Sequence, residues 1–133
     1  MGLDTTHDCW HGGYTSFKIW RDKLAEVAGY KMIVVDGKPA PVIDWEAITQ
    51  ENLSGDWEND PDDMLMILIA HYDTDGYIRA KHTKPLADRL TQLLPLLPDE
   101  IGPGHIGYWK EKTQTFIDGL LSAHEAAQDV EFY

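Results

Sequence analysis

Apolar side chains in the first quarter of the chain recur at intervals of three and four residues, which is the spacing of one helix face. This pattern predicts a helix from Tyr14 to Ala28, ended by Gly29 in a left-handed conformation. Its inward stripe is expected to be Tyr14, Phe17, Trp20, Leu24 and Val27. The charged residues between them, Lys18, Arg21, Asp22 and Glu26, are expected largely on other faces.

A second stripe near the end of the chain predicts a helix from Tyr108 to Ala127. Its members are Trp109, Thr113, Phe116, Ile117, Leu120, Leu121 and His124. We expect this stripe and the first one to form the core together. His124 would then be a buried histidine with a hydrogen-bond partner, since an imidazole on an apolar face needs one.

Two further segments have helical character. Lys84–Leu94 predicts a helix with Pro85 in its first turn, where a missing N–H costs nothing. The continuous apolar run Met64–His71 suits either a strand or a buried helix, and its Met and Leu residues favour the helix.

The strand signals are short. Lys31–Val35 is apolar and β-branched and is followed by Asp36-Gly37, a turn typical of β-hairpins. Pro39 and Pro41 limit the returning strand to a sheet edge.

Tyr77–Arg79 and Val130–Tyr133 are further strand candidates, whereas Glu51–Asp63 is expected to be a long polar loop. A length of 133 residues without a linker suits one domain spanning residues 1–133. The sum is an α+β fold, with three to four helices packed on a small, mainly antiparallel sheet.

The charge distribution narrows the range of partners. The net charge is −12, and no Lys or Arg occurs from Pro39 to Ile78. Ten carboxylates lie in that range: Asp44, Glu46, Glu51, Asp56, Glu58, Asp60, Asp62, Asp63, Asp73 and Asp75. Such a field repels phosphates and argues against direct nucleic-acid binding. Residues 44–63 are here called the acidic segment. They form either a solvated loop or an acidic docking surface that mimics a nucleic acid.

Other features bear on the compartment. The longest apolar run, Met64–Ala70, is far shorter than the ~20 residues of a membrane span, so no membrane partner is expected. Cys9 is the single cysteine, which excludes an intrachain disulfide and fits a cytoplasmic protein.

The segment His7–Gly13 has the densest cluster of reactive side chains. His7 and His11 are suitable ligands for a transition metal, although His-x-Cys-x-His matches no standard zinc pattern. The amides of Gly12 and Gly13, just before a predicted helix, are suited to an anionic group. Cys9 lacks the flanking signature of a cysteine enzyme, so a buried, inert thiol is expected.

The second cluster begins at His71 and includes Asp73 and Asp75 in an Asp-Gly turn. The most basic stretch of the chain follows it and consists of Arg79, Lys81, His82, Lys84 and Arg89, with only Asp88 opposing. They are suited to phosphate or carboxylate contacts. Equally, this basic stretch can pair with the acidic segment, and the sequence leaves both possibilities open.

Several motifs together resemble a family of short bacteriophage and prophage proteins that has no assigned activity. They are the opening Gly2-Leu3-Asp4-Thr5-Thr6-His7-Asp8-Cys9-Trp10-His11-Gly12, the internal His71-x-Asp73-x-Asp75-Gly76-x-Ile78, the segment Tyr108–Leu120 and the final Val130-Glu131-Phe132. The family pattern has serine and cysteine where this chain has Tyr72 and Thr74, so these two side chains receive no role. The resemblance implies a phage origin and the cytosol of an infected bacterium.

Small accessory phage proteins often counter host defence, which suggests one leading function. We expect a non-enzymatic, homo-oligomeric accessory protein that sequesters a small anionic, nucleotide-derived ligand. Its ligand-binding residues would be His7, His11, Gly12, Gly13, His71, Arg79 and Lys81. One alternative is a metal-dependent hydrolase with His7, His11, His71, Asp73 and Asp75 as metal candidates. Another is an acidic decoy acting through Asp44–Asp63; the sequence identifies no cofactor.

Overall fold

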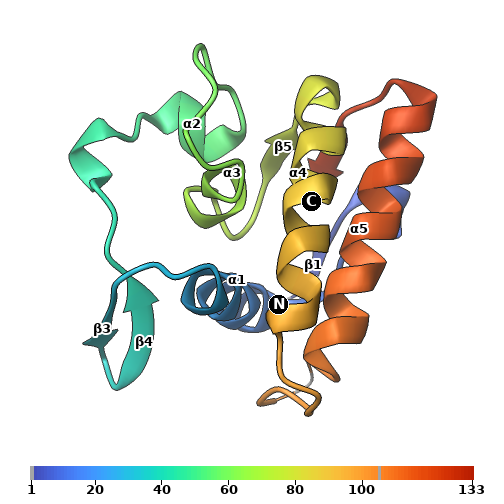
Figure 1. The fold of residues 1–133 in the computed structure, drawn as a ribbon. Helices are drawn as coiled ribbons and strands as arrows, with labels where there is room; N and C mark the ends of the chain where they lie inside the picture. Colours follow the sequence, from blue (N-terminus) through green and yellow to red (C-terminus); the bar gives the residue numbers. More distant parts are fainter. Residues whose placement is uncertain (1, 105) are drawn as a thin grey trace.

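The computed structural model describes residues 2–104 and 106–133 and has an α+β fold, as predicted (Figure 1). The helices are α1 (Tyr14–Val27), α2 (Gln50–Ser54), α3 (Met66–Ile69), α4 (Ala80–Leu93) and α5 (Trp109–Ala126). The strands are β1 (Gly2–Asp4), β2 (His11–Gly13), β3 (Met32–Val35), β4 (Lys38–Pro41), β5 (Gly76–Ile78) and β6 (Val130–Phe132). Short 3₁₀ segments are η1 (Thr6–Asp8), η2 (Trp45–Ala47) and η3 (Leu94–Leu96). Each helix in these residues is too short or too polar to cross a lipid bilayer.

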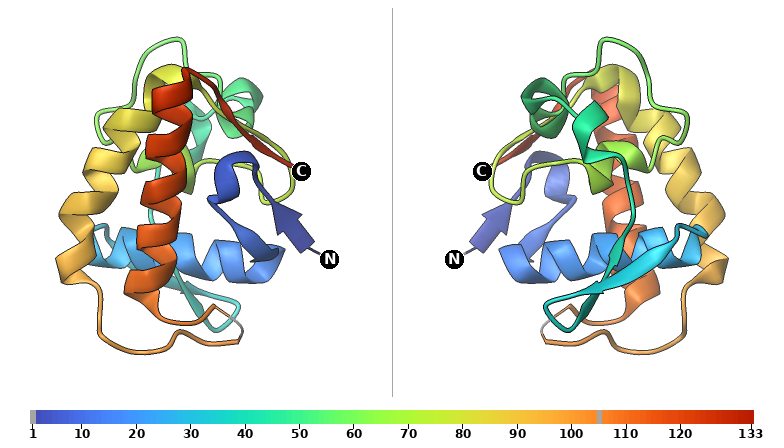
Figure 2. Two further views of the ribbon diagram at one scale, coloured as in Figure 1. Left: turned by 90° about the vertical axis from the view of Figure 1, so that its right-hand side faces the viewer. Right: turned by 90° about the vertical axis from the view of Figure 1, so that its left-hand side faces the viewer.

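The core lies where three helices meet. The helices α4 and α5 run side by side, and α1 crosses them near one end (Figure 2). Trp20 of α1 and Phe116 of α5 are buried with ring centroids 4.8 Å apart, and the Trp20 indole N–H donates to Thr113 Oγ1 at 3.0 Å. The first and last stripes thus share one core, as predicted.

The prediction for His124 was wrong, because this side chain is exposed. The buried face of α5 ends at Ala123, which is completely covered. One residue further on, the helix has turned by about 100°, and His124 therefore faces solvent near the C-terminal end of α5.

The described strands form three antiparallel pairs, β1–β2, β3–β4 and β5–β6. Asp4 and Tyr133 exchange two backbone hydrogen bonds of 2.9 Å, and Thr5 and Phe132 form a bridge. These contacts place β6 beside β1, so that the spatial order is β2, β1, β6, β5 and the two ends of the chain lie together.

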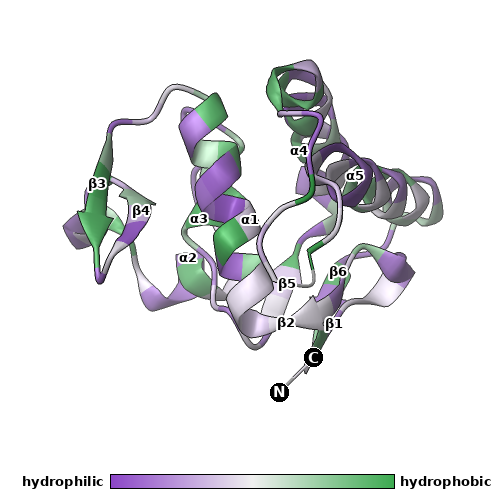
Figure 3. Ribbon diagram, turned by 90° about the horizontal axis from the view of Figure 1, so that it is seen from below, coloured by the Kyte–Doolittle hydropathy of each residue, from purple (hydrophilic) through white to green (hydrophobic). Residues whose placement is uncertain are grey.

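The hairpin of β3 and β4 projects from one side of the helices, with β4 nearer to α1 and β3 outermost (Figure 1, Figure 3). Asp36 and Gly37 have φ angles of 52° and 76°, the left-handed values that a two-residue hairpin turn requires. The predicted turn and the proline-containing edge strand are therefore both confirmed.

Helix α4 begins at Ala80, four residues before the predicted start, so Pro85 lies inside the helix instead of in its first turn. The reason is a distant cap. The carboxylate of Asp129 accepts a hydrogen bond of 2.7 Å from the Ala80 N–H and another of 3.0 Å from Arg79. A residue fifty positions away thereby stabilises the first turn.

The predicted loop Glu51–Asp63 is partly helical, because Thr49 and Asn52 form a capping box at the start of α2. The rest of this acidic segment lies along α4. Its carboxylates pair with basic side chains of that region: Asp56 with Arg79, Asp60 with His82 and Asp63 with Arg89. The basic stretch therefore pairs with the acidic segment, one of the two possibilities left open by the sequence.

Gly119 of α5 packs against the η1 turn, and this contact gives a test of the fold. A Cβ atom there would lie 2.8 Å from the His7 carbonyl oxygen and 2.9 Å from the Cys9 Cα. We expect Gly119→Ala to lower the free energy of unfolding by about 1–3 kcal/mol because of this overpacking. An isolated helix would instead gain about 1 kcal/mol from the same change. Chemical denaturation measures the difference.

The matched control is Thr115→Ala on the exposed face of the same helix. It should change the unfolding free energy by no more than about 0.5 kcal/mol. A Gly119→Ala protein as stable as the control would show that η1 is not packed closely on α5.

Candidate functional site

Arg21 is a buried arginine that joins α1 to the segment after α3. Its side chain donates to the carbonyl oxygens of Leu68 at 3.0 Å and His71 at 2.7 Å, and to the carboxylate of Asp73. The guanidinium also lies 4.4 Å from the centre of the Phe17 ring. Burial lowers the Arg21 pKa, and the charge of Asp73 opposes that shift. An arginine remains charged under these conditions, so Arg21 places a cation in this part of the core.

His71 is held as firmly as Arg21. Only 4% of its surface is exposed, and its Nδ1 and Nε2 lie 2.8 and 3.0 Å from the carbonyl oxygens of Tyr72 and Tyr77. Its ring packs on Phe132 with centroids 4.5 Å apart. Burial is the main cause that lowers the His71 pKa, and the two carbonyl contacts oppose that shift because they favour the protonated ring.

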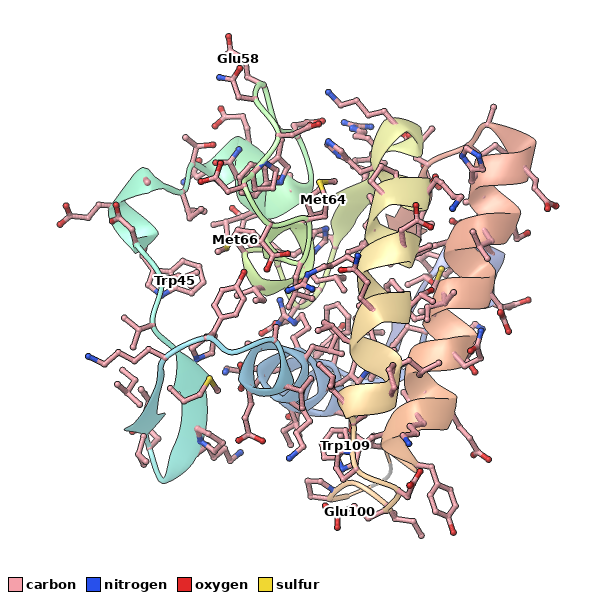
Figure 4. All side chains as sticks on the ribbon, viewed as in Figure 1. Trp45, Glu58, Met64, Met66, Glu100 and Trp109 are labelled. Atoms are coloured by element: carbon pink, nitrogen blue, oxygen red, sulfur yellow. The ribbon has the colours of Figure 1, made fainter. Side chains whose placement is uncertain are left out.

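These fixed groups form the floor of a cavity of about 410 Å³ between the hairpin and the two helices α1 and α3, here called the hairpin pocket. Its lining comprises Lys18, Arg21, Asp22, Ile33, Val35, Ala40, Pro41, Trp45, Ile69, His71, Tyr72 and Asp73. The indole of Trp45 projects from η2 back towards the body of the protein (Figure 4). That side chain is nevertheless 54% exposed. The hairpin pocket therefore combines an apolar wall with a polar floor.

The charges of the hairpin pocket balance. Lys18 pairs with Asp22 at 2.9 Å and Arg21 pairs with Asp73, which gives two cations and two carboxylates in the lining. Such an arrangement suits the binding of a molecule that has both polar and apolar parts.

A larger cavity, of about 650 Å³, lies beside the acidic segment and is here called the acidic-loop pocket. It brings together two predicted ligand residues, Arg79 and Lys81. The Arg79 guanidinium is already bound by Asp56 at 2.5 Å and Asp129 at 3.0 Å. Glu51, Asp56 and Glu58 line the same cavity, so its carboxylates outnumber its two cations. An anionic ligand is therefore poorly matched to this pocket.

The predicted residues at the start of the chain lie elsewhere. His11 is exposed on β2, where its Nδ1 is 2.7 Å from Asp4 and its Nε2 is 2.9 Å from Asp8. Gly13 is the N-cap of α1, and Gly12 is exposed beside it. His7 has a left-handed φ of 59° and lies 3.4 Å from Ser122 Oγ.

His11 lies on β2, and β1 lies between it and β6, whose Phe132 packs on the His71 ring. His71 lines the hairpin pocket, while Arg79 and Lys81 line the acidic-loop pocket. The predicted ligand residues are thus divided among three places within one chain.

Metal ligands do not gather in the described residues: no three His, Cys, Asp or Glu side chains lie close enough to hold one ion. Asp73 is bound to Arg21 and His71 to backbone carbonyls. Cys9 is buried, and this burial raises its thiol pKa to about 12, so the thiolate needed for nucleophilic attack is not formed at pH 7.

The sequence prediction placed Arg21 away from the apolar face, and this was wrong. Phe17, Arg21 and Leu24 are spaced by four and three residues, and all three are buried. That spacing was the available signal for a buried arginine. The roles of Trp45 and Tyr72 had no comparable signal, because each depends on how distant segments pack.

Comparison with protein-family models, curated proteins and solved structures returned no match. The function proposed below therefore rests on the structure of this chain.

The two carboxylates around His11 predict a pH dependence. Hydrogen bonds to Asp4 and Asp8 raise the His11 pKa above 6.5, since they stabilise the imidazolium. A raised pKa contributes stability that is present below 6.5 and is lost as the pH rises through the folded-state pKa. Because the site is exposed, we expect the contribution to be about 0.2–1 kcal/mol.

Titration of the imidazole by NMR should give a pKa above 6.5 for the native protein and a lower one for Asp4→Asn. His11→Gln should remove this part of the pH dependence of unfolding between pH 6 and pH 9. Asp118→Asn, a change at an exposed carboxylate on α5, is the control. An unshifted His11 titration would contradict the paired arrangement.

Proposed function

We propose that the protein is a non-catalytic binding protein that holds a small heteroaromatic molecule, of the nucleoside or nucleotide class, in the hairpin pocket. The observation that carries this proposal is the position of an exposed indole and an apolar wall opposite a floor of buried, hydrogen-bonded polar groups. Ligand sites in proteins commonly have this composition.

The apolar side of the pocket supports a planar ligand. Ile33 and Val35 of the hairpin and Ile69 of α3 form its wall, and Trp45 lies at the side. A large aromatic side chain that is more than half exposed is a common feature of recognition surfaces. Stacking of a base on such a ring is worth roughly 1–3 kcal/mol.

The polar side of the hairpin pocket suits the hydroxyl groups of a nucleotide and a single phosphate near the mouth of the pocket. Asp22 and Asp73 are acceptors, which suits the hydroxyl donors of a ribose. Lys18 is half exposed and is the cation best placed to reach a phosphate. Because both cations in the pocket are paired, we infer that base and sugar contribute more than phosphate charge.

The proposed cellular role is sequestration of a nucleotide-derived signal by a phage accessory protein in the cytosol of an infected bacterium. Its support is the resemblance of the sequence motifs together with a pocket suited to a nucleotide. The acidic-decoy alternative has less support, because Asp56, Asp60 and Asp63 are already paired with Arg79, His82 and Arg89.

Calorimetric titration with adenosine, AMP, cyclic AMP and ADP-ribose tests the proposal. We expect binding of at least one of them to weaken about tenfold or more in Trp45→Ala, which corresponds to ~1.4 kcal/mol. Trp45 is exposed, so its removal should leave the fold intact.

Two variants serve as controls. Tyr108→Ala removes another exposed aromatic side chain, at the start of α5, and Lys81→Ala changes the acidic-loop pocket. Both should bind as the native protein does. The proposal fails if none of the four compounds binds, or if Trp45→Ala binds with unchanged affinity.

A further inference from the structure

The outer edge of β3 is open. In the β3–β4 pairing, Met32 lies opposite Pro41 and Val34 lies opposite Pro39. A proline has no N–H, so neither pair can exchange two backbone hydrogen bonds. The hydrogen-bonding groups of Met32 and Val34 must therefore point away from β4, as the adjacent bond from Val42 N–H to the Lys31 carbonyl at 2.7 Å also requires.

These groups have no partner in the part of the chain that the structure describes, where β3 pairs with β4 alone. The side chains along the edge are apolar and unusually exposed: Ile33 47%, Val34 76% and Val35 47%. Figure 3 shows this apolar strand at the margin of the molecule, with β4 between it and the helices. An open, apolar, β-branched edge is a template for pairing with another strand.

The other edge of the hairpin is closed. Pro39 and Pro41 lie at the positions of β4 whose N–H groups would point outward, so they remove the donors of that edge. The same two prolines thus leave β3 available and block β4. Pairing through this hairpin can add strands on one side only.

The charge of the hairpin indicates what the added strand is. Residues 30–43 contain Lys31, Lys38 and Asp36, a net charge of +1 (two cations minus one anion). The remainder of the chain therefore carries −13, since the whole carries −12. Two copies repel each other through their acidic surfaces, and this repulsion is weakest between the two hairpins, whose own net charge is small.

We propose that β3 pairs antiparallel with β3 of a second copy of this chain. In the register with Ile33 opposite its counterpart, Met32 of each chain faces Val34 of the other. Both pairs exchange two backbone hydrogen bonds, which gives four across the interface.

The result is a four-stranded sheet in the order β4, β3, β3, β4. Two proline-containing edges bound it, so assembly stops at two chains. A two-stranded ribbon is marginal in water, and two added strands stabilise it. Ile33 and Val35 also line the hairpin pocket, so the pairing extends the apolar wall of that pocket. The pairing of two chains does not depend on whether a nucleotide binds there.

The first test is molar mass in solution, by light scattering and sedimentation at about 100 µM protein, which populates a dimer of micromolar Kd. The native chain of 15.1 kDa should give twice that mass. Val34→Pro should give the single-chain mass with an unchanged circular-dichroism spectrum, because the removed N–H has no bond within the chain. Val34→Thr keeps the N–H and the β-branched shape, and should remain a dimer.

The second test needs no substitution. Amide hydrogen exchange of the native protein should slow with rising concentration at Met32 and Val34, whose N–H groups point outward. Ile33 and Val35, which pair with Ala40 and Lys38 of β4, should change much less. A single-chain mass for the native protein, a dimer that persists in Val34→Pro, or concentration-independent exchange at Met32 and Val34 would overturn the proposal.

Discussion

The guanidinium of Arg21 is the contact on which the described site depends. It ties α1 to the carbonyls of Leu68 and His71, which lie at the end of α3 and beyond it, and to the carboxylate of Asp73. Desolvation of a buried cation is costly, and three acceptors together with the Phe17 ring offset that cost. The Arg21 side chain is 6% exposed and that of Asp73 is 44% exposed, so solvent partly screens this ion pair, while the carbonyls of Leu68 and His71 hold the cation as well. These contacts fix the end of α3 and the residues after it to α1.

The hairpin pocket combines a fixed floor with a projecting wall. The floor is Arg21, His71 and Asp73, held by hydrogen bonds except at Arg21 Nε, which has no partner among the described residues. The outer wall is a hairpin that packs on α1 mainly through β4. The prolines of β4 contribute to two properties: they close one edge of the hairpin, and they orient the backbone groups of β3 outward. The proposed ligand would contact the face of β3 that carries Ile33 and Val35, whereas the proposed pairing between copies would use the backbone edge of the same strand.

The sequence predicted what depends on near neighbours along the chain. Periodic apolar residues predicted α1 and α5, and Asp36-Gly37 predicted the hairpin turn, because helix faces and tight turns are local properties. The early start of α4 could not be predicted, since its cap is Asp129 from the far end of the chain. The candidate site was predicted only in part. His71 and Asp73 were identified, but Trp45 reaches the pocket only because of tertiary packing, and Arg21 was missed although it occupies an apolar position of the α1 repeat.

We propose that a nucleotide binds between the hairpin and α1, not beside the acidic segment. A titration of ¹⁵N-labelled protein with AMP, followed by amide and indole NMR signals, locates the ligand directly. We expect the largest shifts at the Trp45 indole and at the amides of Val35, Tyr72 and Asp73. Shifts confined to residues 56–59 and 79–81, or to the loop of residues 7–13, would contradict it.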